Sequence, residues 1–397
     1  MNQSSNPLQS FDISEEGKAI QTNLSSKIQS EIIEQGGKIP FSKFMQMALY
    51  QPELGYYQNN LHKFGEKGDF ITAPEMGSNF AKCLASGLVD FISSGNGNLR
   101  LMEIGAGSGI LAANLLDELK HLGALPNQYL ILEPSAELQA QQKSLLLSRH
   151  REYFENIIWI SELPEDFRGI ILANEVVDAI PCERMVRKDS LWRKLGVSYK
   201  GGEFVDCLLD EVKVDDLPES LKTTGYLGDY PEGYMAEYRP LVKGWIRAIS
   251  NSLKQGAIIL FDYGYAESEL YHPQRLAGSL TCFINHYSHS DPYQYIGLQD
   301  ITAHVDFTQI AQTAHEFSLE VEGYTTQAGF LLENGIIEIS EKLAKNESEE
   351  QRYKRSQELQ KLLMPGQMGE VIKVILLSKN LEPEIKGLSL QDHLHRL

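Results

Sequence analysis

Short apolar runs alternate along the middle of the chain with stretches in which apolar residues recur at helical spacing. Runs rich in Leu and Ile that end in polar or glycine-rich residues predict buried strands, and the spacing between the runs predicts helices. Strands are expected near 99–103, 128–134 and 157–160, at the start of 168–185 and at 256–265, with helices at 111–122, 136–147 and 240–253. This alternation is typical of a parallel sheet that helices cover on both faces.

The two ends of the chain extend this pattern. The first 98 residues are predicted to hold a loose arm (1–20) and then an N-terminal region (21–98) with a helix at 23–35, a second helix within 39–57 that Ser42 caps, and a third that starts after Pro74-Glu75. The last residues are predicted to hold helix 307–317, strand 318–326, helix 327–334, a long charged helix (337–361), a closing strand (370–378) and a tail (379–397).

Two stretches interrupt the alternation inside the core, which we place at 99–378. Residues 186–239 contain a β-hairpin that turns at Gly201-Gly202, and residues 266–305 are rich in loops. Because the alternation resumes after each stretch, we interpret both as insertions and not as domains. The predicted fold is therefore α/β, with a Rossmann-like seven-stranded sheet whose last strand is antiparallel.

The stretch LMEIGAGSGIL (101–111) joins the first strand to its helix through alternating glycines, Gly105, Gly107 and Gly109. Glycine lets the backbone turn sharply and lets a ligand lie close to it. A dinucleotide site would require a further glycine where Ile110 stands, to seat a pyrophosphate on the helix. Glu103 would oppose a phosphate but suits a ligand with ammonium and sulfonium groups. From the turn alone, a purely structural role stays open.

An acid, Glu133, ends the second strand. At this position of a doubly wound sheet an acid points at the ribose of a nucleotide, where its two oxygens accept both hydroxyl protons. The alternative is that Glu133 caps the next helix, but Ser135 is better placed for capping. We therefore favour ribose binding.

Polar residues also follow the fourth strand: Asn174, Glu175 and Asp178. Open α/β sheets bind their ligands at the carboxyl ends of central strands, so these side chains are candidates for the site. The start of a surface helix would show the same residue types, and that interpretation stays open as well.

Composition narrows the class of protein. The net charge of −18 over 397 residues disfavours a nucleic-acid backbone as the main partner, and no apolar run is long enough to span a bilayer. Four scattered cysteines and a polar N-terminus predict a cytoplasmic protein. No metal site is predicted, because the spacing of four candidate ligands fits no standard zinc knuckle: Cys282, His286, His289 and His304.

An ordered set of motifs resembles the MidA-like family of S-adenosylmethionine (SAM)-dependent methyltransferases. The family includes the mitochondrial protein-arginine methyltransferase that assists respiratory complex I assembly, and many bacterial members. The resemblance extends over about residues 39–378. It rests on PxxGYY at 52–57, GDFxTAPE at 68–75, ExGxGxG at 103–109, EPS at 133–135, NExxDAxP at 174–181, DYG at 262–264, DxTAHVDF at 300–307 and GQMG at 366–369.

The resemblance implies a class I methyltransferase with SAM as cofactor. It implies that Gly105 and Gly107 line the methionine part of SAM and that Glu103 meets its ammonium group. It also implies that Asp69 and Thr72, in an N-terminal loop, cover the cofactor as a lid that excludes water. The expected cofactor-binding residues are Asp69, Thr72, Glu103, Gly105, Gly107, Gly109, Glu133, Ser135 and Asn174.

The predicted function is SAM-dependent methylation of arginine side chains in a partner protein. For such an acceptor, carboxylates must orient the guanidinium and accept its protons. Candidate catalytic residues are Glu175, Asp178, Asp262, His304 and Asp306. Asn174 could hold the acceptor or the adenine side. Two alternatives remain: methylation of a small-molecule oxygen or nitrogen, and a SAM-binding assembly factor without transfer activity. The oligomeric state is open, a homodimer included.

Overall fold

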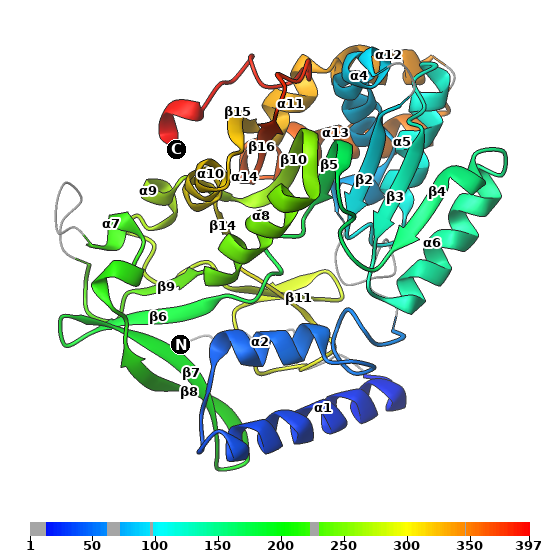
Figure 1. The fold of residues 1–397 in the computed structure, drawn as a ribbon. Helices are drawn as coiled ribbons and strands as arrows, with labels where there is room; N and C mark the ends of the chain where they lie inside the picture. The colour runs from blue at the N-terminus through cyan, green and yellow to red at the C-terminus, as the bar shows by residue number, and fades with distance from the viewer. Residues whose placement is uncertain (1–12, 62–71, 96–97, 223–229, 346) are drawn as a thin grey trace.

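A mixed β-sheet forms the centre of the molecule (Figure 1). The computed structural model describes residues 13–61, 72–95, 98–222, 230–345 and 347–397. The strands of this sheet follow the order β15-β16-β10-β5-β2-β3-β4, and β14 pairs with β10. Their bounds are β2 Arg100–Ile104, β3 Gln128–Leu132, β4 Ile157–Ile160, β5 Phe167–Asn174, β10 Leu253–Tyr265, β14 Val305–Asp306, β15 Glu320–Thr326 and β16 Ile372–Lys379.

The direction of the strands confirms the predicted sheet. Strands β10, β5, β2, β3 and β4 pair in parallel, while the closing strand β16 lies antiparallel to both β10 and β15. The five parallel strands therefore end at one edge of the sheet, where open α/β sheets bind their ligands.

Helices cover both faces of the sheet, because successive strand residues point to opposite sides. Leu101 packs into the cluster on one face and its neighbour Met102 into the cluster on the other. One face carries α4 Asn79–Ser94, α5 Ile110–His121, α6 Ala136–Arg149, α11 Gln327–Glu333, α12 Ile336–Ala344 and α13 Glu349–Leu363, and the other carries α8 Pro240–Ser252 and α10 Phe307–Glu316. In the part of the chain that the structure describes, no helix is both long and apolar enough to cross a bilayer.

A second layer of structure lies below the main sheet in Figure 1 and contains the N-terminal helices and the insertions. One antiparallel sheet has the order β1-β7-β6-β9, with β8 paired to β7, and a smaller one has the order β12-β11-β13. The bounds here are α1 Glu15–Glu34, β1 Ile39–Pro40, α2 Phe41–Tyr50, β6 Glu183–Lys188, β7 Leu191–Lys200, β8 Glu203–Glu211, β9 Met235–Tyr238, β11 Thr281–Ile284, β12 Tyr287–His289 and β13 Asp300–Thr302. The remaining short helices are α3 Ala73–Met76, α7 Glu219–Lys222, α9 Glu267–Leu270 and α14 Met368–Val371.

The insertions form these extra sheets. Strands β7 and β8 make the predicted hairpin, and Gly201 and Gly202 turn it with φ of 63° and 93°. The first strand of the insertion, β6, begins at Glu183, slightly before the expected boundary at 186.

The N-terminal helices differ from the prediction at their starts. Helix α1 begins at Glu15, so the described part of the expected loose arm (1–20) is mostly helical. The Ser14 side chain caps it, and Ile20 belongs to the same buried apolar cluster as Leu298, which local spacing does not reveal. Ser42 does not cap α2, since its hydroxyl instead donates to Glu183 Oε1 at 2.7 Å.

The long charged helix expected at 337–361 is two helices, α12 and α13. Helix α13 has its own start, a capping box in which the Ser348 hydroxyl accepts from the backbone of Gln351 and the Gln351 side chain accepts from the backbone of Ser348. The predicted single helix was wrong because a polar sequence without a clear apolar stripe hides such a break.

Candidate active site

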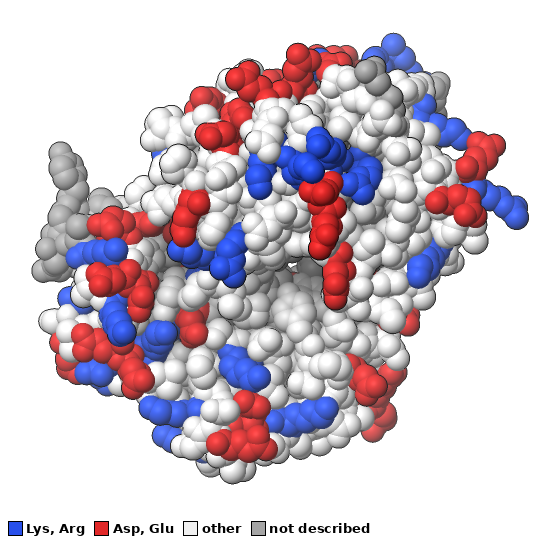
Figure 2. All heavy atoms as spheres, viewed as in Figure 1, with Lys and Arg blue, Asp and Glu red and all other residues white. Residues whose placement is uncertain are grey.

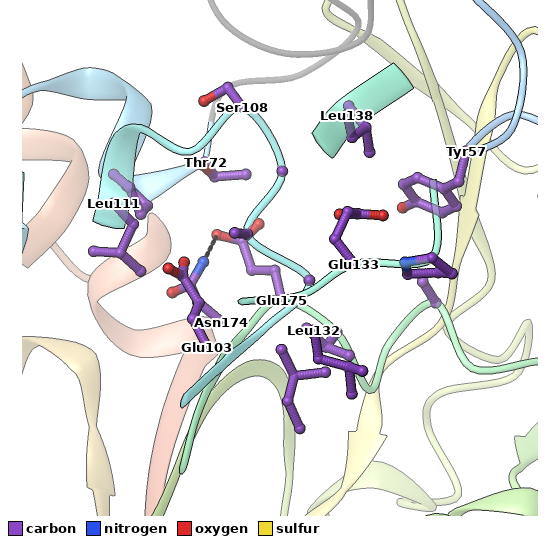
Figure 3. A pocket seen from close by; sticks show the side chains of 18 of the residues that line it. Tyr57, Thr72, Glu103, Ser108, Leu111, Leu132, Glu133, Leu138, Asn174 and Glu175 are labelled. Atoms are coloured by element: carbon purple, nitrogen blue, oxygen red, sulfur yellow. Dashed lines mark hydrogen bonds between the residues drawn. The ribbon is translucent and has the colours of Figure 1, made fainter. Parts of the chain in front are cut away.

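A cavity of about 390 Å³ opens at the carboxyl ends of β2, β3 and β5. Its opposite wall comes from the end of α2 and the turn that follows it. The face shown in Figure 2 is hollowed near its centre, between the main sheet and the N-terminal helices. Figure 3 shows the cavity from close by, with side chains from both walls around it.

The glycine turn lies on the floor of this cavity. Gly105 and Gly107 line it, with φ of 68° and 52°. A Cβ on Gly105 would lie 3.1 Å from Val176 Cγ2, so a side chain there would be crowded as well as strained. Gly109 does not line the cavity. It precedes α5 with φ of 83°. It can therefore contribute to the predicted cofactor site through the shape of the turn.

Glu103, at the end of β2, is 2% exposed and lines the cavity. Tyr129 Oη donates a hydrogen bond of 2.6 Å to its Oε2. Burial raises the pKa of Glu103 to about 7, and the bond from Tyr129 opposes that rise. An incoming cation would favour the ionised form, which fits the predicted contact with an ammonium group.

Glu133, at the end of β3, also lines the cavity and is held in place by two donors. The backbone N–H of Ser135 donates to Oε1 at 2.9 Å, and Gln142 Nε2 donates to Oε2 at 3.3 Å. The Ser135 side chain instead caps α6, where it accepts from Leu138 N. Ser135 therefore supports Glu133 through its backbone and is not part of the cavity wall.

Gln142 is a residue that the sequence analysis missed. It is fully buried in α6 and donates to the Gly107 carbonyl at 2.9 Å as well as to Glu133. Trp159 Nε1 donates to Gln142 Oε1 at 2.9 Å and fixes the amide. Nothing in a helix of mixed polar residues distinguishes this glutamine, because its role depends on contacts with residues that are distant in the sequence.

Asn174 and Glu175, at the end of β5, meet at the centre of the cavity (Figure 3). Asn174 Nδ2 donates to Glu175 Oε1 at 3.1 Å. The backbone of Glu175 has φ of 52° and its N–H donates to the Phe261 carbonyl at 2.8 Å. Burial, with a smaller contribution from the charge of Asp178, raises the pKa of Glu175 to about 8.

Asp262 lies behind this loop and does not line the cavity. Its Oδ2 accepts from three successive backbone N–H groups, those of Val176 (3.1 Å), Val177 (2.8 Å) and Asp178 (3.3 Å). Asp178 is likewise outside the cavity wall, and burial raises its pKa to about 6 against the opposing charge of Arg239. Asp262 thus holds the backbone of the loop that follows Glu175, and neither acid lines the cavity.

His304 and Asp306 are not brought to the cavity by the part of the chain that the structure describes. Asp306 caps α10 by accepting from Gln309 N at 3.0 Å. The His304 ring packs edge-on against Tyr265 at 5.3 Å, and burial together with Arg275 lowers its pKa to about 4. Their positions do not support the predicted contact with the acceptor.

Of the two residues expected to form a lid, only Thr72 is described, and it lines the cavity just before α3. Asp69 lies outside the described residues. Two further wall residues, Tyr50 and Tyr57, had no predicted role, although Tyr57 ends the PxxGYY motif. In the sequence, only the two adjacent tyrosines of that motif could have indicated that this segment contributes to the cavity wall.

The ionisable side chains described in the cavity wall are acidic. Four glutamates line it (Glu75, Glu103, Glu133 and Glu175), and among the described residues no Lys, Arg or His does so. A wall of this kind favours a ligand with positive charge and hydroxyl donors, and disfavours a phosphate. SAM carries an ammonium, a sulfonium and a ribose beside one carboxylate, so its net positive charge and its hydroxyl donors fit the residues present.

Comparison with known proteins agrees with this site. Residues 83–325 match the model of a family of S-adenosyl-L-methionine-dependent methyltransferases. A Burkholderia thailandensis protein with a crystal structure bound to S-adenosyl-homocysteine is 34% identical, with a TM-score of 0.89 over 98% of this chain and 100% of that one. The chain belongs to this methyltransferase family, which confirms the predicted fold and the predicted cofactor, SAM.

More distant relatives are the mitochondrial protein arginine methyltransferases NDUFAF7. The Danio rerio protein is 27% identical over 89% of this chain and 85% of its own length. The Bos taurus protein is 25% identical over 85% of this chain and 79% of its own. These matches confirm the resemblance that the sequence motifs indicated.

Proposed function

We propose that this methyltransferase acts on arginine side chains of a partner protein. The observation that carries the proposal is the wall of four glutamates without a cationic side chain among the described residues. The names of the NDUFAF7 relatives support the same acceptor. The cytoplasmic location and a possible homodimer stay predictions, the former supported by four free cysteine thiols.

The glutamates divide into those that suit the cofactor and one that does not. Glu103 suits the ammonium group and Glu133 the ribose of SAM. Glu75 receives a hydrogen bond from the Ser108 hydroxyl at the glycine turn. Glu175 remains. Its carboxyl group accepts from Asn174 and from the backbone of Ala73, and it is the carboxylate left for a cationic acceptor. We assign it to the guanidinium.

When bound, SAM supplies an electrophilic methyl group and its own leaving group. The chain must then hold the acceptor nitrogen in line and receive the proton that it loses. Glu175 can do both in its ionised form. Its pKa is raised to about 8 in the unliganded protein, and a guanidinium beside it favours the carboxylate, which then accepts the proton that the nitrogen loses. Asp262 and Asn174 hold this carboxyl and its loop in one orientation.

The proposal is tested by methyl transfer from labelled SAM into the proteins of a lysate that lacks this enzyme, followed by acid hydrolysis and analysis of the labelled amino acids. We expect methylarginine with the unchanged protein. With Glu175→Gln we expect a loss of about 100-fold or more, the typical contribution of a general base, with SAM affinity retained. Glu165→Gln, at an exposed loop position, is the matched control.

Label on lysine or on a small molecule would overturn the arginine proposal, and so would tight SAM binding without any transfer. Undiminished transfer by Glu175→Gln would overturn the role of that carboxylate alone.

A further inference from the structure

Two aromatic side chains form the wall of the cavity that faces the sheet. Tyr50 ends α2, Tyr57 follows in the next turn, and both line the cavity. Their rings stack with centroids 5.5 Å apart and planes 24° apart. The buried ring of Tyr56 packs against Tyr57 in a T-shaped arrangement, with centroids 5.0 Å apart. Figure 3 shows the ring of Tyr57 pointing into the cavity beside Glu133.

The hydroxyl groups of this pair are already engaged by the protein. Tyr50 Oη donates to the Ala179 carbonyl at 3.0 Å, in the loop that follows Glu175. Tyr57 Oη donates to Asp300 Oδ1 at 2.9 Å. Burial and the nearby carboxylates raise the pKa of both phenols, so both stay protonated donors. What the two tyrosines offer to a ligand is therefore the surface of their rings.

An aromatic ring face attracts a cation, and it does so most strongly where water is excluded. The glutamates of the same cavity add negative charge as they ionise, a change that a bound cation favours, and no Lys, Arg or His of the described chain competes for the rings from the cavity wall. We propose that the Tyr50–Tyr57 pair is a binding wall for an organic cation.

Two cations of the reaction share this chemistry: the sulfonium of SAM and the guanidinium of the acceptor. The second of these sources rests on the proposed function, whereas the first depends only on the methyltransferase family.

Binding of the sulfonium is tested by calorimetric titration of SAM and S-adenosyl-homocysteine, which differ by the methyl group and the positive charge that it gives the sulfur. If the wall binds the sulfonium, Tyr57→Leu or Tyr50→Leu weakens SAM binding by about 3- to 30-fold, as expected for a desolvated cation–π contact, and leaves S-adenosyl-homocysteine nearly unchanged. Tyr57→Phe and Tyr50→Phe keep the ring, remove the bond to Asp300 or Ala179, and retain the preference for SAM.

The guanidinium is tested by titrating ethylguanidinium, and its neutral analogue ethylurea, into the protein saturated with S-adenosyl-homocysteine. If the wall binds the acceptor, the unchanged protein prefers ethylguanidinium, and the Leu variants lose that preference by about 3- to 30-fold while the Phe variants keep it. Thermal unfolding of each variant establishes that it is folded at the temperature of titration.

A loss of cation preference with either probe supports the proposal and identifies the source. The proposal is overturned if the Leu variants change neither preference, if they weaken charged and neutral probes equally, or if the Phe variants lose as much as the Leu variants. Failure of the proposed function is a separate result, since it shows as absence of methylarginine with the unchanged protein and leaves the sulfonium titration intact.

Discussion

Glu175 combines features that a residue selected for stability alone would lack. It is a partly buried carboxylic acid in a cavity wall, it follows a central strand with φ of 52°, and it has a second acid, Asp178, nearby. A left-handed backbone at a residue other than glycine costs on the order of 1–3 kcal/mol, and burial of the carboxyl adds to this. The surrounding loop, held by Asp262, must offset that cost.

The raised pKa of Glu175 predicts a pH-dependent stability of the unliganded protein. Its pKa rises from 4.5 to about 8 in the folded state, so between these values the folded chain holds a proton that the unfolded chain has released. Stability from this group is full below 4.5 and is lost as the pH rises through 8. Glu175→Gln is therefore expected to unfold at a higher temperature than the unchanged protein at pH 8, by on the order of 1–3 kcal/mol in stability, and at a similar temperature at pH 4.5.

Thermal unfolding at the two pH values measures this difference. Glu165→Gln, which is exposed and not part of the cavity wall, is expected to show the same difference from the unchanged protein at both pH values. An equal effect of Glu175→Gln at pH 4.5 and pH 8 would contradict the prediction.

At the scale of elements, the glycine turn between β2 and α5 is expected to contribute both to the stability of the fold and to SAM binding, and the two contributions can be measured separately. Gly105→Ala puts a Cβ on a backbone with φ of 68° and 3.1 Å from Val176. We expect a loss of stability of about 1–2 kcal/mol and a loss of SAM affinity of about 10-fold or more, since the floor of the cavity must shift.

Gly201→Ala is the matched control for this turn. Its φ of 63° imposes a similar strain, but nothing lies within 4 Å of its Cβ and it belongs to the β7–β8 hairpin. Stability measurements and SAM titrations should show similar destabilisation in both variants and weaker SAM binding only in Gly105→Ala. If Gly105→Ala binds SAM normally, the turn does not form the cofactor floor.

The elements also show how far sequence reasoning reaches. Strand ends could be located from apolar runs, and with them Glu103, Glu133, Asn174 and Glu175, because a parallel sheet aligns its carboxyl ends at one edge. The direction of a side chain could not be predicted where a long loop decides it. Asp306 caps α10 and Asp262 accepts from the backbone, so neither lines the cavity, and their catalytic roles stay predictions.

Residues that act across the fold carried too little signal to be found. Tyr57 reaches Asp300, which lies 243 residues later in the chain, and Gln142 reaches the glycine turn from a helix of mixed polar residues. Local spacing describes neither contact, since both depend on how separate layers pack together.

For the whole molecule, Arg239 connects three regions at the junction of β9 and α8. It is 3% exposed and donates to the carbonyls of Asp178 (2.7 Å), Ile180 (3.1 Å) and His304 (2.7 Å), and also to that of Ala303. One guanidinium thus joins the loop after Glu175 to both insertions.

Arg239→Lys keeps the charge but cannot satisfy these carbonyls from a single nitrogen. We expect a loss of stability of about 2–4 kcal/mol and a larger loss in the rate of methyl transfer than in SAM affinity, because Glu103 and Glu133 are held independently of it. Arg247→Lys, exposed on α8, is the control. Equal losses of rate and affinity would show that Arg239 supports the fold alone.

The stacked tyrosines and the strand ends face each other across the cavity, yet they come from parts of the chain that acquire their shape by separate contacts. A ligand bound between them contacts both walls of the cavity. Its binding free energy then also stabilises the packing of the amino-terminal helices against the sheet, so a higher occupancy of the cavity makes separation of these two parts less favourable.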